Sequence, residues 1–376
     1  MMATIDEFAA QFGEETGFLD FARLGPIGSA VVEEELAQNN LRHRARYGSL
    51  GTIQAQDERV REAVAELIGF RADQVVFQPS TTAGLVHAFF GLSGGLLLSP
   101  VEFPSVRFAA MRAAEARGVL VPTWIDYLDG GLETPGVITP GMLRPRLTPA
   151  ISAVAVSLVD YRTGFVADLE GIRQVIGDRL LIVDAAQGFG VVPAAFEAAD
   201  VVASGGQKWA RAGWGTGFLA LSDRAVERLR PVLSGLLLGS EAWPPGPVPA
   251  PPREAAAFQI TLPNPVAQAR LTAAVEGILA VGIDAVYARV LERTDRIIDL
   301  VDGFGLEVVS PRAAGERAGI VVVDPGVDRI TALSAALHNH GVSVTVREGR
   351  VRLSAHVSTS DETLDTLRLA LTEFAA

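Results

Sequence analysis

The sequence predicts an α/β protein with a large domain built on a mostly parallel, doubly wound sheet and a smaller α+β domain after it. Short apolar strands alternate with helical patterns from about residue 74 to residue 222, which is typical of a parallel sheet covered by helices. A proline-rich segment, WPPGPVPAPP at 243–252, then interrupts the chain. We therefore predict an N-terminal arm at 1–16, a large domain at 17–250 and a small domain at 251–376.

Apolar spacing gives the individual elements of the large domain. Helical spacing predicts helices near the N-terminus and over 29–40, 56–68, 83–90, about 105–117 and 169–176. Compact apolar runs predict strands at 74–77, 96–99, 119–124, 153–159, 180–184, 200–204 and 218–221. The segment 130–149 is rich in Gly, Pro and Thr and is predicted to be mainly loop, with a helical turn possible at 142–147.

The same patterns continue beyond the proline-rich segment. They predict helices over 265–280, 283–301, 328–340 and 361–374, and strands over 306–310, 318–323, 342–347 and 350–354. The chain shows no internal repeat.

Composition limits the function. The 376 residues are 49% hydrophobic and 20% charged, as in a folded globular protein, and the net charge of -12 argues against a general nucleic-acid or anionic-membrane surface. There is no cysteine, which excludes disulfides, thiolate metal sites and a cysteine nucleophile, and the histidines have no metal-like spacing. No apolar run is long enough to cross a membrane, and the N-terminus resembles neither a signal nor a transit peptide. We expect a soluble cytoplasmic protein.

A hydroxyl-rich loop between a strand and a helix predicts a phosphate site. Ser80, Thr81 and Thr82 follow the strand at 74–77 and precede the helix at 83–90. Free backbone N–H groups, the positive end of the helix dipole and the hydroxyls would all meet at one point, where an anion is favoured. The alternative is a simple helix cap by Ser80 or Thr81.

Lys208 is the only lysine in the chain, because the other 31 basic residues are arginine. It lies between the glycine turn of Gly205-Gly206 and Trp209. Arginine stays protonated in proteins, whereas a lysine amine can lose its proton and form a Schiff base with a carbonyl group. The alternative is a surface lysine left over in an arginine-rich composition, and the spacing does not fit a nucleotide-binding P-loop.

Two further strand ends point to the same crevice. Asp184 closes the apolar strand at 180–184, and Phe103 follows the strand at 96–99. Ligands in open α/β sheets bind at the carboxyl ends of the strands. Pyridoxal 5'-phosphate needs an amine for its aldehyde, an acid for its pyridine nitrogen, a ring face to stack on and donors for its phosphate, and each need has a candidate here.

Three segments carry a family resemblance: VDAAQ at 183–187, SGGQKW at 204–209 and GTGFL at 215–219. With them the chain resembles the class V aminotransferase family of fold-type I pyridoxal phosphate enzymes, in the branch of cysteine desulfurases, kynureninases, isopenicillin N epimerase and ergothioneine-pathway C–S lyases. The resemblance implies that Lys208 forms the Schiff base and that Asp184 pairs with the pyridine nitrogen. It also implies a homodimer.

The resemblance extends to the remaining site residues. It implies that Phe103 stacks on the cofactor ring, that Gln187 binds its phenolic oxygen, and that Arg352 pairs with the substrate α-carboxylate, where guanidinium and carboxylate form a two-bond fork. The full predicted cofactor-binding set is Ser80, Thr81, Thr82, Phe103, Asp184, Gln187, Ser204, Gln207 and Lys208, and the substrate-binding set is Arg352, Arg23 and Tyr161. Gln207 stands where relatives often carry histidine.

The sequence leaves the reaction open. Because cysteine desulfurases of the family relay sulfur through a cysteine, the absence of cysteine predicts that this enzyme is not a cysteine-persulfide desulfurase. A lyase that eliminates a group at Cβ of an α-amino acid, by C–S or C–C cleavage, is favoured slightly over a transaminase or epimerase. A non-enzymatic relative that binds the cofactor is the least favoured reading.

Overall fold

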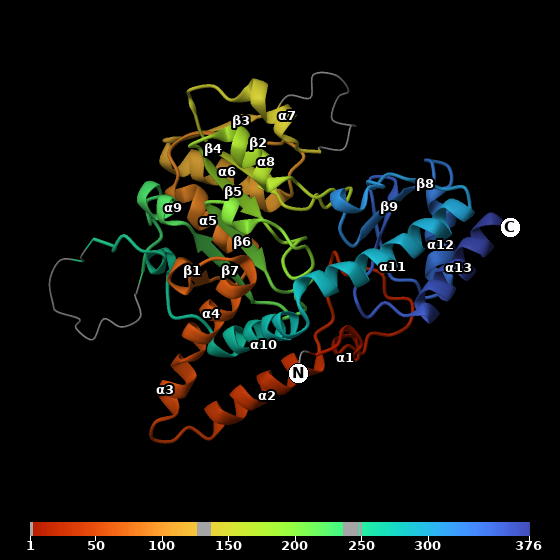
Figure 1. The fold of residues 1–376 in the computed structure, drawn as a ribbon, viewed down its shortest axis with the longest axis horizontal. Helices are drawn as coiled ribbons and strands as arrows, with labels where there is room; N and C mark the ends of the chain where they lie inside the picture. The colour runs from red at the N-terminus through yellow and green to blue at the C-terminus, as the bar shows by residue number, and fades with distance from the viewer. Residues whose placement is uncertain (1–2, 126–136, 236–247, 249) are drawn as a thin grey trace.

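The structure of the protein is a computed structural model that describes residues 3–125, 137–235, 248 and 250–376. It contains a seven-stranded and a four-stranded sheet (Figure 1), with the order β1-β7-β6-β5-β4-β2-β3 in the larger one. The strands of the larger sheet are β1 Val75–Phe77, β2 Gly94–Leu98, β3 Leu120–Trp124, β4 Ile151–Ser157, β5 Leu180–Asp184, β6 Val201–Gly205 and β7 Gly217–Leu221. Only β7 runs against its neighbours β1 and β6, so the predicted mostly parallel sheet is confirmed.

Helices cover both faces of the large sheet, because its central strands are apolar on both sides. In β5, Leu181 and Val183 pack into one hydrophobic cluster, whereas Leu180 and Ile182 pack into another on the opposite face. The first cluster includes residues of α4 Gln56–Ile68, α8 Leu169–Ile176 and α10 Pro265–Val281, and the second includes residues of α5 Thr81–Gly91 and α6 Pro104–Arg117. The doubly wound arrangement is therefore present.

The four-stranded sheet is antiparallel, with the order β10-β11-β9-β8. Its strands are β8 Glu307–Val308, β9 Ile320–Asp324, β10 Thr345–Arg347 and β11 Arg350–Ser354, and its helices are α11 Ile283–Gly303, α12 Ile330–Asn339 and α13 Asp361–Ala375. A third hydrophobic cluster joins this sheet to these helices. Most of the proline-rich segment at 243–252 lies outside the described residues, so the domain boundary at 250 stays a prediction.

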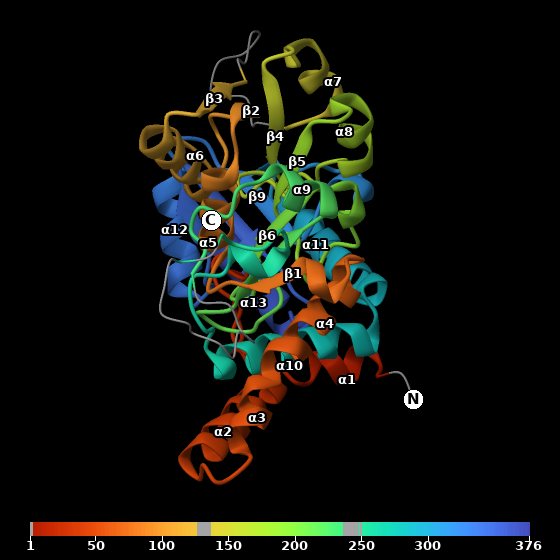
Figure 2. The ribbon, with the colours of Figure 1, turned by 90° about the vertical axis from the view of Figure 1, so that its left-hand side faces the viewer.

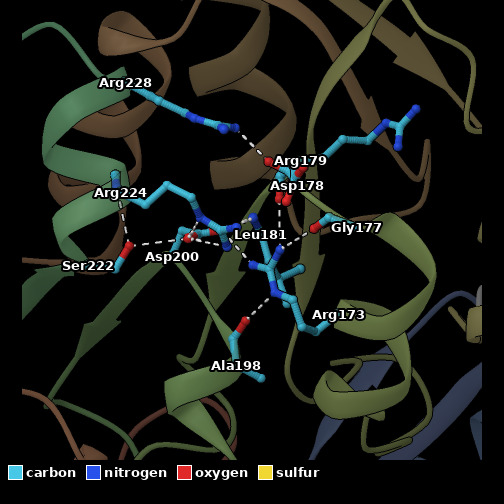
Figure 3. A network of polar contacts seen from close by, with 11 residues as sticks. Arg173, Gly177, Asp178, Arg179, Leu181, Ala198, Asp200, Ser222, Arg224 and Arg228 are labelled. Atoms are coloured by element: carbon cyan, nitrogen blue, oxygen red, sulfur yellow. Dashed lines mark hydrogen bonds and ion pairs between the residues drawn. The ribbon is translucent and has the colours of Figure 1, made fainter.

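One buried carboxylate holds together the amino-terminal ends of β5 and β6, two central strands of the large sheet. Asp200, which is 2% exposed, lies just before β6. It accepts hydrogen bonds from the backbone N–H of Leu181 at 2.8 Å and from Arg224 Nε at 2.7 Å, and it also pairs with Arg173 (Figure 3). These partners belong to three different elements, β5, α9 and α8. The network therefore fixes β5 and β6 relative to each other and to two helices at the amino ends of the strands.

Several short or peripheral helices complete the fold. The helical turn predicted at 142–147 begins slightly earlier, as α7 Pro140–Leu143 and the 3₁₀ turn at Arg144–Arg146. The remaining helices are α1 Ile5–Ala9, α2 Ser29–His43, α3 Ser49–Gln54 and α9 Asp223–Arg228. Figure 2 shows α2 and α3 extending away from the body of the molecule. Among the helices in the described ranges, none is by itself long and apolar enough to span a membrane; α10 and α11 meet that test only as a pair bent by 86°.

Candidate active site

A cavity of about 550 Å³ lies at the carboxyl ends of the parallel strands, between the two sheets. It is lined by eleven of the predicted site residues: Arg23, Ser80, Thr81, Thr82, Phe103, Tyr161, Asp184, Gln187, Gln207, Lys208 and Arg352. Ser204 is not among the lining residues. It is fully buried within β6, and its hydroxyl donates to the carbonyl of Gly205 at 3.3 Å. Elements from the N-terminal segment, the large sheet and the small sheet therefore meet at one place.

Lys208 enters the cavity from the turn after β6, and its backbone is held from the N-terminal side. The N–H of Gly25 donates to the carbonyl of Gln207 at 2.9 Å. A Cβ atom at Gly25 would come within 2.1 Å of the Lys208 carbonyl, so this close approach needs glycine. The Lys208 Nζ atom lies 5.3 Å from the centroid of the Phe103 ring. The turn thus fixes where the amine sits.

Arg211 anchors the other end of this turn. Its side chain is completely buried, forms an ion pair with Glu14, and donates to Ser358 Oγ at 2.7 Å and to the carbonyl of Pro26. Its backbone adopts φ 58°, which is uncommon for a residue other than glycine. Because Ser358 follows β11, Arg211 links the lysine turn to the strand that carries Arg352.

Burial changes the protonation of Lys208. Desolvation lowers the pKa of its amine from 10.5 to about 8, and the negative charge of Asp184 opposes that shift. The nearby guanidinium groups of Arg352 and Arg347 lower it further. A substantial fraction of the amine is therefore neutral near pH 8, as a nucleophile or a base must be.

This pKa gives a direct prediction for the protein without cofactor. A lowered pKa means that the neutral, reactive amine forms at lower pH, so we expect the rate of modification of Lys208 by trinitrobenzenesulfonate to rise with a midpoint near pH 8. The chain has no second lysine, and a Lys208→Arg variant gives the background of the N-terminal amine. A midpoint near 10.5 would show that the amine is fully solvated and would contradict the geometry.

Asp184 ends β5 with one carboxylate oxygen free. Its Oδ1 accepts from the N–H of Ala186 at 2.9 Å, and Oδ2 has no hydrogen-bond partner among the described residues. Burial raises the pKa of this carboxyl, while the bond from Ala186 and the positive charge of Lys208 lower it. The free oxygen can pair with a cationic ring nitrogen, which would itself favour the ionised carboxylate.

Behind Asp184 lies a second buried carboxyl group, Glu102. It accepts from the backbone N–H of Ser157 at 3.1 Å and from the Ser157 hydroxyl at 2.5 Å. Ser157 is the neighbour of Asp184 across β4 and β5. Desolvation raises the pKa of Glu102 to about 7, against the effect of the two hydrogen bonds. Glu102 was not among the predicted site residues, although a charged residue shortly after an apolar strand is a signal that the sequence does contain.

At the opposite end of the cavity, hydroxyl groups surround the start of α5. Ser80 caps the helix by accepting from the N–H of Ala83 at 3.2 Å, so capping occurs as the simpler alternative expected. The hydroxyls of Thr82 and Ser105 lie 2.8 Å apart, and Thr81 Oγ1 has no hydrogen-bond partner among the described residues. This site suits a phosphate group, because it combines the start of a helix with the unpaired hydroxyl of Thr81 and the hydroxyls of Ser80, Thr82 and Ser105.

Gly205 keeps this end of the cavity open. A Cβ atom there would lie 2.2 Å from Gln207 Oε1 and 3.3 Å from Thr81 Oγ1. Only glycine at position 205 therefore leaves room for the Gln207 amide next to the hydroxyl of Thr81. Gln207 and Thr81 both line the cavity.

Aromatic and amide side chains form the walls. The rings of Phe103 and Tyr161 meet edge to face at 5.1 Å. Gln187 accepts from Trp209 Nε1 at 2.8 Å and donates to the carbonyl of Ala22 at 2.9 Å, so its amide is held in one orientation. Trp209 itself is buried and does not line the cavity. One N–H of the Gln187 amide has no protein partner in the described structure and can serve a ligand.

Arg352 closes the substrate end and is already engaged by protein groups. It donates to the carbonyl of Tyr161 at 3.3 Å and to Thr345 Oγ1 at 3.2 Å, and it lies 3.7 Å from Asp20. Its Nε is buried without a hydrogen-bond partner among the described residues. Asp20, 6% exposed, also accepts from Thr345 Oγ1 at 2.7 Å. Asp20 was not predicted, because Thr345 and Arg352, which it contacts in the cavity, lie more than 300 residues away in the sequence.

These groups fit pyridoxal phosphate. Lys208 can hold the aldehyde, the free oxygen of Asp184 can pair with the ring nitrogen, and Phe103 offers a ring face. The hydroxyls at the start of α5 can hold the phosphate. The fit rests on the free carboxylate oxygen of Asp184 and the cradle kept open at Gly205. No group of three or more potential metal ligands occurs in the part of the chain that the structure describes.

Comparison with known proteins gives consistent matches. The family model described as "Aminotransferase class-V" matches residues 27–351. A "Probable cysteine desulfurase" of Aeropyrum pernix is 29% identical over 76% of this chain and 72% of its own length, and a "Kynureninase" of Deinococcus radiodurans is 27% identical over 78% and 72%. Among solved structures, the cystine C–S lyase C-DES with its reaction product cysteine persulfide has a TM-score of 0.82 at 19% identity, covering 96% of this chain and 97% of that one.

These matches correct one sequence-based prediction. The statement that the enzyme is not a cysteine-persulfide desulfurase is wrong, because a relative that aligns over three quarters of the chain is named a cysteine desulfurase. The prediction assumed that sulfur must pass through a cysteine of this chain.

Proposed function

Because this chain belongs to the class-V aminotransferase family of pyridoxal phosphate enzymes, we propose that it cleaves the Cβ–S bond of a sulfur-containing α-amino acid. The observation that carries the proposal is the placement of the only lysine, with a pKa lowered to about 8, in one cavity with Asp184 and Arg352. The relative named as a cysteine desulfurase supports sulfur as the atom that leaves Cβ. The reaction removes the Cα proton and the sulfur group, and overall it consumes one water and yields a thiol, pyruvate and ammonia.

The chain's own groups can divide this work. Arg352 would orient the substrate through its α-carboxylate, with Asp20 and Thr345 holding the guanidinium in place. Bound pyridoxal phosphate supplies a conjugated ring that accepts the electron pair left at Cα. Lys208, once its amine is free of the cofactor, would take the Cα proton, since its lowered pKa suits a base near neutral pH.

Tyr161 is the group that can assist the leaving sulfur. It lines the cavity, and burial raises the pKa of its hydroxyl, so the proton stays on the oxygen at neutral pH. A protonated hydroxyl can donate a hydrogen bond to a developing thiolate, which lowers the barrier to its departure. A proton for the thiolate can come from Tyr161 or from the ammonium group of Lys208.

A second candidate differs only in the fate of the sulfur. In desulfuration, cysteine would become alanine and the sulfur atom would pass to a thiol that is not part of this chain, giving a persulfide. The name of the Aeropyrum relative favours this candidate. The sequence contains no cysteine, so the acceptor would have to be a separate molecule.

Product analysis tests both candidates. We expect the holoenzyme, given S-ethyl-L-cysteine, to release ethanethiol, pyruvate and ammonia in equal amounts over many turnovers. With cysteine and an added small thiol, alanine and a persulfide of that thiol would identify desulfuration. If the enzyme instead yields a keto acid that keeps its sulfur, together with the amine form of the cofactor, the proposal of C–S cleavage fails and the enzyme is a transaminase.

We also propose that the enzyme forms a homodimer. Helices α2 and α3 extend from the body of the molecule (Figure 2). They carry exposed apolar residues, among them Val32, Leu36 and Leu50. A second copy would cover this surface.

A further inference from the structure

The hairpin that carries Arg352 brings a second arginine into the cavity. In the β10–β11 pairing, Thr345 lies opposite Arg352 and Arg347 lies opposite Arg350. Since side chains alternate along a strand, these four residues share one face of the hairpin. Arg347 and Arg352 both line the cavity, whereas Arg350 does not. The same face therefore presents two guanidinium groups to one ligand site.

The hairpin turn fixes the position of Arg347. The two turn residues, Glu348 and Gly349, have φ angles of 51° and 75°. Positive φ at both central residues is the signature of a tight two-residue hairpin turn, whose twist matches that of the strands. A non-glycine residue held at positive φ requires support from its surroundings, and Glu348 has an ion pair with Arg162 at 3.3 Å. The backbone of Arg347 is thus preorganised.

Arg347 differs from the neighbouring arginines in its partners. Arg350 pairs with Asp324 at 3.2 Å, Arg352 with Asp20 at 3.7 Å, and Arg162 with Glu348. In the described part of the chain, no carboxylate lies within ion-pair distance of Arg347. Its guanidinium instead lies 5.6 Å from the centre of the Tyr161 ring. Arg347 is therefore an exposed cation at the lining of the cavity, and no carboxylate of the described residues pairs with it.

The walls of the cavity relate this cation to the chemistry. Lys208 Nζ lies 5.3 Å from the Phe103 ring, Phe103 meets Tyr161 at 5.1 Å, and Tyr161 in turn contacts Arg347. A substrate with its Cα near Lys208 and its α-carboxylate on Arg352 would extend its side chain along the Phe103–Tyr161 wall. The guanidinium of Arg347 lies at the Tyr161 side of that wall.

We propose that Arg347 binds a second anionic group of the substrate, so that the preferred substrate is an α-amino acid whose sulfur leaving group carries a carboxylate or a similar acid. This inference rests on the proposed C–S cleavage and names its substrate class. A guanidinium group binds a carboxylate through a charge-assisted fork, which adds both affinity and orientation. Arg347 is then a specificity-determining residue.

A matched substrate pair tests the subsite. S-carboxymethyl-L-cysteine and S-carbamoylmethyl-L-cysteine have nearly the same shape and differ in one negative charge. We expect wild-type holoenzyme to use the carboxylate with a kcat/KM about 10- to 100-fold higher, since hydrogen bonds to charged groups contribute in that range. Arg347→Gln should remove this preference, so that the two substrates have the same kcat/KM in that variant, and Arg347→Lys should keep part of it. Arg350→Gln, which removes the same charge outside the cavity, should keep all of it.

Binding is measured separately from turnover, through the change in visible absorbance of the holoenzyme on titration with each compound. The wild-type enzyme could bind the carboxylate compound more tightly than the amide, lose that difference in Arg347→Gln, and yet release no thiol or pyruvate from either compound. This outcome would contradict C–S cleavage and would support the subsite. Thiol release from both compounds with equal binding and equal kcat/KM would overturn the subsite alone. A preference that survives Arg347→Gln but is lost in Arg23→Gln would likewise overturn the assignment to Arg347.

Discussion

Replacing Lys208 with alanine is expected to lower kcat by at least about 10³-fold, because a positioned base alone contributes about 10²- to 10⁴-fold. The substitution removes two functions at once, the covalent hold on the cofactor aldehyde and the base for the Cα proton. No other amine can replace it, since the chain has a single lysine and its arginines stay protonated. The cavity itself should remain, because the turn is held through the backbone of Gln207 and the side chain of Arg211.

The measurement uses a covalent label as well as activity. Borohydride treatment of the wild-type holoenzyme should fix the cofactor to the peptide that contains Lys208, and mass spectrometry should find no such label in Lys208→Ala. Lys208→Arg is the matched control, because it keeps the positive charge but cannot provide a neutral amine. Labelling at the N-terminal amine in the wild type, or normal turnover by either variant, would contradict the assignment.

The features that the sequence predicted well are those that a local pattern determines. The strands β1 to β7 are short apolar runs bounded by turn residues, and each strand in the structure begins and ends within two residues of the predicted bounds. Lys208 and Asp184 were predicted to lie at one site because a residue type that occurs once and the end of an apolar strand can both be recognised from the sequence alone. Their shared cavity followed from the rule that ligands bind at the carboxyl ends of parallel strands.

The features that the sequence could not give depend on contacts between distant segments. Asp20 contacts Arg352, which lies more than 300 residues away in the sequence, and no local sequence pattern predicts this pair. Ser204 was predicted to bind the cofactor; the structure buries it completely within β6 and does not place it among the lining residues of the cavity, and the role stays a prediction. Arg347 could have been inferred, because the strands at 342–347 and 350–354 were both predicted, and pairing them around the two residues between them would have placed it near Arg352.

The second large effect is expected at Asp184. Replacing it with asparagine keeps an oxygen for the N–H of Ala186 but removes the negative charge. An opposite charge nearby shifts a pKa by about 1 to 3 units, so without it the cofactor ring nitrogen should lose most of its proton near neutral pH. Because electron withdrawal by the ring depends on that proton, we expect kcat to fall by about 10- to 10³-fold while the variant still binds the cofactor through Lys208.

The measurement separates loss of charge from loss of structure. Cofactor content by visible absorbance, thermal unfolding and kcat are compared for wild type, Asp184→Asn and Asp184→Ala. The alanine variant is also reconstituted with N-methylpyridoxal phosphate, whose ring nitrogen carries a permanent positive charge and whose methyl group needs the space that alanine leaves. Recovery of activity with this analogue would show that Asp184 acts by maintaining that charge. A kcat of wild-type size in Asp184→Asn would instead show that the buried carboxylate, like Glu102 behind it, is there for packing and hydrogen bonding rather than for catalysis.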